Sequence, residues 1–128
     1  MNLLLDTHTF LWWVAGDEQL SVQAKRAIGD PQNTVRFSAA SAWEIAIKAS
    51  LGRLDVPRDL TRFLAEQLWL NDFVELPVHV SHAAFVQSLP RHHRDPFDRM
   101  LVAQAHLDDL VLVTRDPAFE AYDVTALW

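Results

Sequence analysis

The sequence predicts an α/β domain in which helices cover both faces of a parallel sheet. Short apolar runs alternate with helical segments along the chain, and 128 residues are enough for one domain with its own core. No repeat, linker or low-complexity segment divides residues 1–128. In such folds the crossovers are right-handed and the functional crevice lies outside the carboxyl ends of the strands.

The first half of the chain contains two expected strands. Residues 2–5 are an apolar run typical of a strand buried on both faces, and residues 34–38 form the next strand. Ser41 and Glu44 have the spacing of a capping box, which places Glu44 in the first turn of a helix. The expected helices here are one at residues 9–16 closed by glycine, one capped by Ser21 and ending before Gly29, and one from Ser41 to Leu51.

The second half continues the alternation. Asp95 followed by Pro96 indicates an N-cap with proline at the first helical position, and Asp98 then falls in the first turn. The expected elements in order are a helix starting at residues 57–59, a strand at 73–76, a helix capped by Ser81 and ending at Pro90, a helix from 96 to about 106, a strand at 110–114, a helical turn at 118–122 and an edge strand at 124–128.

Composition limits the classes of function. The absence of cysteine excludes disulfides and thiolate metal sites, and is consistent with a reducing cytoplasm. No apolar run is long enough to span a bilayer, and the first residues lack a basic leader, so we expect a domain without a membrane anchor. A net charge of -6 argues against general nucleic-acid coating, but not against a local basic surface.

Four acidic residues are expected at one edge of the sheet. Asp6 and Asp116 follow strands, and Glu44 follows the second strand by a short stretch. Asp98 joins them if its helix begins at the same edge. The simpler interpretation of such acids is that they cap helices or complement helix dipoles, each contributing up to about 1 kcal/mol.

Four converging carboxylates cannot all stay ionised without compensation, and a divalent cation resolves the repulsion. Oxygen ligands without cysteine favour Mg²⁺ or Mn²⁺, an ion that activates water and neutralises charge in phosphoryl chemistry. Asp95 is sufficiently explained as a cap, and whether it also contributes to the metal site stays open. Four hydroxyl groups are candidates for orienting ligands or water, although each is also explained as a cap or strand residue; they belong to Thr7, Ser38, Ser41 and Thr114.

Other classes fit the sequence less well. Asp6 is followed by Thr7 and His8, whereas receiver domains and haloacid-dehalogenase-type phosphatases need paired acids there. A serine hydrolase would need a Gly-x-Ser-x-Gly turn, which is absent. The histidines, considered at positions 79, 82, 92, 93 and 106, show no recurring zinc-ligand spacing. A non-catalytic binding module stays open, because the acids then serve only as caps.

Taken together, the motifs resemble one family, the PIN domains, and specifically the VapC-type toxin ribonucleases of bacterial and archaeal toxin-antitoxin pairs. The matching segments are Leu4-Leu5-Asp6-Thr7-His8, residues 38–45 with Lys48 a turn later, residues 95–105, and Val113-Thr114-Arg115-Asp116. The resemblance covers essentially the whole chain. It implies a single PIN domain, a three-layer sandwich with strand order 3-2-1-4-5, and a metal-dependent endoribonuclease that leaves a 5′-phosphate. The implied acidic site is Asp6, Glu44, Asp98 and Asp116.

Partners follow from charge and from this resemblance. An acidic protein needs local cations to hold RNA, and those near the acids are Lys48, Arg91, Arg94, Arg99 and Arg115. The resemblance implies a small antitoxin encoded nearby. We also expect the protomers to pair as homodimers and, from the absence of cysteine, a cytoplasmic location. Adjacent Trp12 and Trp13 point about 100 degrees apart on a helix, so we expect at least one to line an apolar groove for the antitoxin.

Overall fold

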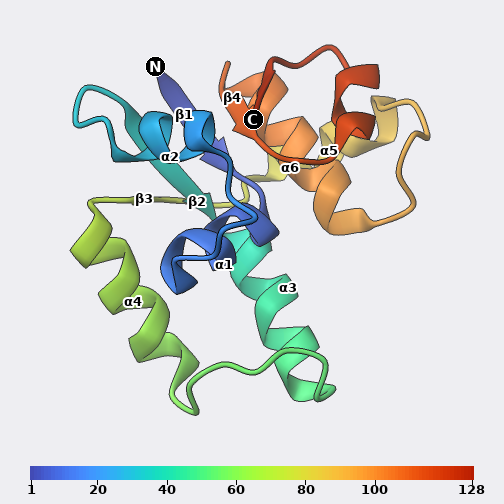
Figure 1. The fold of residues 1–128 in the computed structure, drawn as a ribbon. Coiled ribbons are helices and arrows are strands. Elements are labelled where there is room, and N and C mark those ends of the chain that lie inside the picture. The colour runs from blue at the N-terminus through green and yellow to red at the C-terminus, as the bar shows by residue number, and fades with distance from the viewer.

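Five parallel strands form the central sheet, in the order β3-β2-β1-β4-β5 (Figure 1). The computed structural model describes all residues from 1 to 128. The strands are β1 (Asn2–Leu5), β2 (Thr34–Ser38), β3 (Val74–Leu76), β4 (Val111–Val113) and β5 (Ala126–Leu127). The helices are α1 (Thr7–Ala15), α2 (Val22–Gly29), α3 (Ala39–Ser50), α4 (Leu60–Asn71), α5 (Val80–Phe85) and α6 (Pro96–Leu107), with 3₁₀ helices at Val86–Ser88 and Pro117–Ala121. The predicted fold class and strand order are confirmed.

The central strand β1 separates two cores. Leu3 and Leu5 face a core shared with α1, α2 and α3, in which the rings of Phe10 and Phe37 lie 4.1 Å apart. Leu4 faces the opposite side, where it packs against α6 and the segment after β4. Because both faces are covered, β1 is apolar at every buried position, as a parallel sheet requires.

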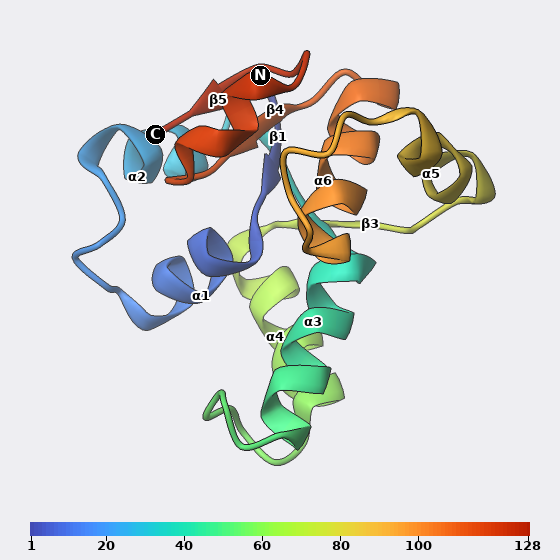
Figure 2. The ribbon, with the colours of Figure 1, turned by 90° about the vertical axis from the view of Figure 1, so that its right-hand side faces the viewer.

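The helices lie in two groups at different ends of the molecule. In both views α3 and α4 extend to the end opposite the amino terminus, while α5 lies beside α6 (Figure 1, Figure 2). A buried polar chain ties α6 to the sheet: the Ser38 hydroxyl donates to Gln104 Oε1 at 2.6 Å, and the Gln104 amide donates to the Pro77 carbonyl. No helix combines the length and apolar character that crossing a bilayer would require.

Three predicted helix starts are wrong by two or three residues. The first helix begins at Thr7 rather than Thr9, because Asp6 caps it directly after β1. The third begins at Ala39, because Ser38 accepts the Ala40 N–H; Ser41 is therefore inside the helix and Glu44 is in its second turn. The predicted cap Ser81 lies inside α5, which starts after His79 and changes to a 3₁₀ helix at Val86.

The remaining elements agree with the predictions to within one or two residues, apart from the shorter final strand. Ser21 caps α2, and Asp95 caps α6 with Pro96 at its first position. The predicted turn after Asp116 is a 3₁₀ helix.

Phe10 offers a test of the larger core. Its side chain is fully buried against Phe37, so Phe10→Ala is expected to lower the free energy of unfolding by about 3–5 kcal/mol. Urea unfolding followed by circular dichroism measures the change. Val80→Ala is the control, because Val80 is 86% exposed and should shift stability by no more than about 0.5 kcal/mol. Equal losses in both variants would contradict this assignment of the core.

Candidate metal centre

Asp6 lies at the carboxyl end of β1 and is buried. Its Oδ1 accepts the Thr9 N–H at 2.8 Å, which caps α1, and its Oδ2 accepts the Thr114 hydroxyl at 2.5 Å. Thr114 also accepts the Asp116 N–H at 3.1 Å, so one hydroxyl bridges the ends of β1 and β4. These bonds fix the orientation of the Asp6 carboxylate.

Glu44 reaches the same edge from the second turn of α3. Its Oε1 is 2.6 Å from the Thr7 hydroxyl, and its Oε2 pairs with Lys48 at 2.5 Å. Thr7 also lies 2.9 Å from the Ser41 hydroxyl. Since Thr7 has one hydroxyl hydrogen, the arrangement that satisfies all groups has Thr7 donating to Glu44 and Ser41 donating to Thr7. Glu44 is thereby held as a buried, paired carboxylate.

Asp98 projects from the first turn of α6, and it is the acid whose ionisation the fold opposes most. Burial is the main reason that the pKa of its carboxyl rises from 3.8 to about 7. The charges of Asp95, Glu44 and Asp6 raise this pKa further, whereas His93 lowers it. Asp95 itself caps the helix, accepting from Phe97 N at 2.8 Å. Asp98 is therefore within electrostatic reach of two acids from other elements.

Asp116 follows β4 and caps the 3₁₀ helix at Pro117–Ala121. Partial burial opposes its ionisation, but the Ala118 N–H bond and His93 outweigh this and lower the pKa of Asp116. His93 Nε2 lies 3.1 Å from Asp116 Oδ2. One ligand atom each from His93, Asp98 and Asp116 can be chosen so that all three lie within 4.8 Å of one another.

The four predicted acids thus converge at the carboxyl edge of the sheet, and we call them the acid cluster: Asp6, Glu44, Asp98 and Asp116. The Ser41 hydroxyl bonds to Thr7 rather than to an acid, whereas Thr7 and Thr114 bond directly to members of the cluster. Ser38 does not, because its hydroxyl is used by the α3 cap and Gln104. The donor set, mostly carboxylate oxygen with one imidazole and uncompensated negative charge at Asp98, fits a divalent cation.

The predicted basic residues lie on two sides of the acid cluster. A hollow of about 500 Å³, the arginine hollow, is lined by Arg91, His93, Arg94 and Arg99. Arg99 is already committed within it, since its guanidinium donates to the carbonyls of Pro90 and Val86. A second hollow of about 400 Å³, the Trp12 hollow, is lined by Asp6, His8, Trp12, Arg115 and Asp116.

The tryptophans only partly follow the prediction. Trp12 and Trp13 are half-buried, and Trp13 donates its indole N–H to Asn71. Trp12 lines a hollow whose other lining residues are charged or polar, and neither Trp12 nor Trp13 lines the mainly apolar hollow at Trp43 and Phe97. The exposed tryptophans are Trp43 at 65% and Trp69 at 82%.

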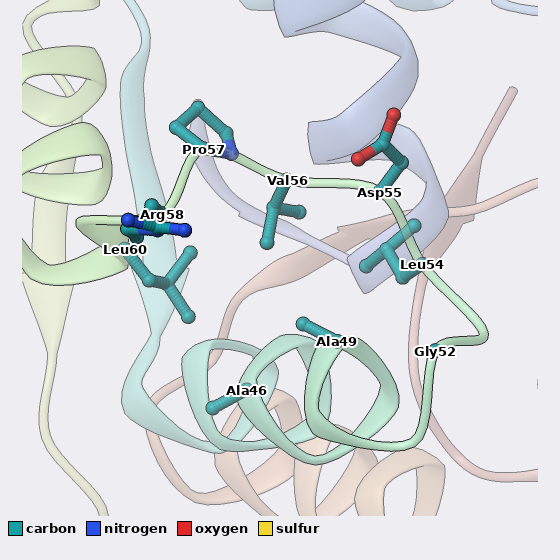
Figure 3. A pocket seen from close by; sticks show the side chains of 9 residues that line it. All are labelled: Ala46, Ala49, Gly52, Leu54, Asp55, Val56, Pro57, Arg58 and Leu60. Carbon is teal, nitrogen blue, oxygen red and sulfur yellow. The ribbon is translucent and has the colours of Figure 1, made fainter.

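The largest hollow, about 610 Å³, contains none of the acid cluster. It lies between α3 and the segment leading to α4, over the small side chains of Ala46 and Ala49 (Figure 3). Val56 and Leu54 form much of its opposite wall. Because it lacks converging polar groups, we assign the chemistry to the acid cluster rather than to this larger space.

His93 is the member of the centre that spacing in the sequence missed. Its ring is held between Tyr122 and Phe119, with centroids at 5.5 and 4.6 Å. Both aromatic residues come from the segment after Asp116. No local sequence pattern around His93 predicts its contacts with Tyr122 and Phe119. Its position two residues before the Asp95 cap did indicate that it lies near the centre.

Comparison with known proteins defines the class. The PIN domain family model matches residues 3–124, and the chain belongs to the PIN domain family. Within that family it is 30% identical, over 120 residues, to Ribonuclease VapC22 of Mycobacterium tuberculosis, covering 90% of this chain and 87% of that protein. This relationship places it with the VapC-type proteins.

Solved structures show the same fold at lower identity. The VapBC2 structure of Rickettsia felis, bound to a promoter DNA fragment, aligns with a TM-score of 0.72 at 12% identity and covers 99% of this chain and 98% of its own. The VapBC-1 structure of nontypeable Haemophilus influenzae aligns with a TM-score of 0.65 at 17% identity, covering 99% and 97%.

The raised pKa of Asp98 predicts a pH dependence of stability in metal-free buffer. Between about pH 4 and pH 7 the folded protein keeps a proton on Asp98 that the unfolded chain has released, so the free energy of unfolding falls as pH rises. Asp98→Asn should remove this fall, and above pH 7 should be more stable than wild type by about 2 kcal/mol, a value reduced for solvent screening. Urea unfolding with chelator at several pH values measures the difference. Parallel stability curves for the two proteins would contradict the raised pKa.

Proposed function

We propose that this protein is a toxin-type, metal-dependent endoribonuclease of the cytoplasm. The observation that carries the proposal is the convergence of four carboxylates, from four different elements, at one edge of the sheet. The name of the ribonuclease relative supports RNA as the substrate. A Mg²⁺ or Mn²⁺ ion held there would activate a water and neutralise charge on the scissile phosphate.

The residues of the centre divide the work. Asp98 and Asp116 offer the most accessible oxygens for an ion, since Asp116 is 43% exposed and the fold leaves the Asp98 charge uncompensated. Asp6 and Glu44 are held by hydroxyl bonds that orient them toward the same space. Lys48 forms an ion pair with Glu44 and so compensates the charge of that buried acid.

The basic groups provide a path for the RNA backbone. The arginine hollow meets the centre at His93, and the Trp12 hollow meets it at Asp6 and Asp116. An RNA strand whose phosphates lie in the arginine hollow and whose next base lies against Trp12 would pass over the acid cluster, which lies between the two hollows. Arg115 lies 5.9 Å from the Trp12 ring centroid and borders the same hollow.

A non-catalytic binding module is the competing proposal, and a specific observation favours it: Asp6, Asp95 and Asp116 each cap a helix. Asp98 separates the two functions, because it caps nothing and the fold opposes its charge. A group that costs stability and has no structural bond is expected where chemistry requires it.

Asp98→Asn is therefore the decisive catalytic test. Removing the charge while keeping the shape should lower RNA cleavage in Mg²⁺ or Mn²⁺ by at least about a hundredfold, with the fold retained. Cleavage is measured on a labelled RNA, with circular dichroism and Mn²⁺ titration in parallel. Asp109→Asn, on the loop before β4, is the matched control and should cleave at the wild-type rate. Wild-type cleavage by Asp98→Asn would support the binding module instead.

The backbone path predicts which arginines matter. Arg91 and Arg94 are exposed and free to meet phosphates, whereas Arg99 is used by carbonyls. The double change Arg91→Ala and Arg94→Ala should weaken RNA binding about tenfold or more at low salt and reduce the steepness of its salt dependence. Filter-binding assays, with the arginine changes made in a catalytically inactive variant, measure the RNA affinity and its salt dependence. Arg53→Ala with Arg58→Ala controls for net charge, and an equal loss there would refute a local path.

We further propose a small antitoxin as the neutralising partner and a homodimer as the free form. The antitoxin proposal rests on the VapBC pairs among the structural relatives, and the homodimer on the prevalence of two-fold pairs among soluble oligomers. Two hollows suit a partner segment: the hollow of Figure 3, in which five of nine lining residues are hydrophobic, and a hollow of about 360 Å³ that includes Trp43 and Phe97, in which six of seven are. Each is lined mainly by hydrophobic side chains, unlike the acid cluster.

Tryptophan fluorescence tests the partner. Binding of the neighbouring gene product should reduce acrylamide quenching, because Trp43 and Trp69 are the tryptophans most open to solvent. Trp43→Phe and Trp69→Phe, measured separately, identify which surface is covered. Unchanged quenching together with no complex on a sizing column would exclude this partner and leave the nuclease proposal standing.

A further inference from the structure

We propose that His93 is a nitrogen ligand of the metal centre, so that the ion is held by one imidazole together with Asp98 and Asp116. The inference rests on the metal-dependent function proposed above and adds a ligand and an ion preference to it. His93 lies in the segment before α6, and its side chain is only 8% exposed. A histidine buried among carboxylates at a solvent-facing site calls for an explanation beyond packing.

The distances suit shared ligation. One ligand atom each from His93, Asp98 and Asp116 lie within 4.8 Å of one another. Ligand atoms around a six-coordinate ion of this size are separated by about 3 to 4.3 Å, so small side-chain movements complete the shell. Asp6 and Glu44 are not in this closest set, and their oxygens are already engaged by hydroxyls and Lys48.

The ring of His93 is oriented from behind, as metal-bound histidines usually are. Its Nδ1 lies 3.1 Å from the Tyr122 hydroxyl, which also accepts the His93 backbone N–H at 3.0 Å. Packing against Phe119 and Tyr122 fixes the plane of the ring. With Nδ1 committed to Tyr122, the nitrogen left facing the acids is Nε2, at 3.1 Å from Asp116 Oδ2.

The proton on the ring can be placed in each state. Without an ion, Nε2 carries the hydrogen and donates it to Asp116, and Tyr122 donates to Nδ1. For Nε2 to act as a ligand, its proton must leave that atom, and the Nδ1–H tautomer allows this because the Tyr122 oxygen then accepts.

An imidazole ligand changes which ion the site prefers. Mg²⁺ favours an all-oxygen shell, whereas imidazole nitrogen raises affinity for first-row transition ions. The centre should therefore bind Mn²⁺ more tightly than Mg²⁺, and His93→Gln should reduce that difference. Gln keeps a polar side chain but removes the aromatic nitrogen.

Electron spin-echo measurements on Mn²⁺ bound to the full-length protein test the ligand directly. Wild type should show modulation from a coordinated histidine nitrogen, which changes when the protein is labelled with ¹⁵N-histidine. The modulation should disappear in His93→Gln and persist in His8→Gln, the other histidine bordering the acids. Mn²⁺ titration should show at least about a tenfold loss of affinity for His93→Gln, with a smaller change for Mg²⁺.

The wild-type spectra decide the question even if a variant fails to fold. No histidine coupling in labelled wild type, or coupling that survives His93→Gln, would overturn the proposal. Failure here is distinguishable from failure of the nuclease proposal, because RNA cleavage by wild type is measured separately. Cleavage without histidine coupling would support a nuclease whose ion has only oxygen ligands. Histidine coupling without cleavage would support His93 as a ligand but not the nuclease proposal.

Discussion

Negative charge gathered at one edge of the sheet is the constraint on which the rest of this structure depends. Burial and the charges of neighbouring acids raise the pKa of Asp98, whereas the other three acids are held by specific bonds. Thr114 bonds to Asp6, Thr7 to Glu44, and His93 to Asp116. Asp98 alone receives no such bond, and its pKa is raised to about 7. The electrostatic cost of bringing the acids together therefore falls mainly on Asp98. An added cation would stabilise the ionised form of this side chain more than that of the other three acids.

The strand order creates this edge. β1 lies between β2 and β4, so the residues after β1 and β4 are neighbours, and a single hydroxyl on Thr114 can bridge Asp6 and the Asp116 N–H. Glu44 arrives from α3 on one side of the sheet and Asp98 from α6 on the other. The buried link from Ser38 to Gln104 holds α6 against the end of β2, which fixes the position of the Asp98 turn. A polar bond deep in the fold therefore supports the geometry of a surface site.

Short-range patterns predicted the fold and placed Asp6, Asp98 and Asp116 at strand ends or at the Asp95-Pro96 helix start, whereas the capping box that placed Glu44 in a first turn is absent from the structure. Apolar runs, the Asp95-Pro96 start and Ser21 identify elements directly. Ser41 was the predicted cap of α3, but the helix follows β2 without a loop and Ser38 caps it instead. His93 could not be found in this way, because its role depends on Tyr122 and Phe119, nearly 30 residues away, and on the carboxylate of Asp116.

The sequence left open whether these acids cap helices or form a functional site. In the structure a single carboxylate can do both, because its two oxygens have different partners. In Asp6 and Asp116 the Oδ1 atom caps a helix, and the Oδ2 atom meets the Thr114 hydroxyl or His93 at the centre. The cap fixes the carboxylate plane, so the second oxygen is presented without loss of side-chain freedom at the moment of binding. A residue that caps a helix can therefore also present a fixed oxygen at the centre, and helix N-termini at this edge lessen the repulsion that the acids create.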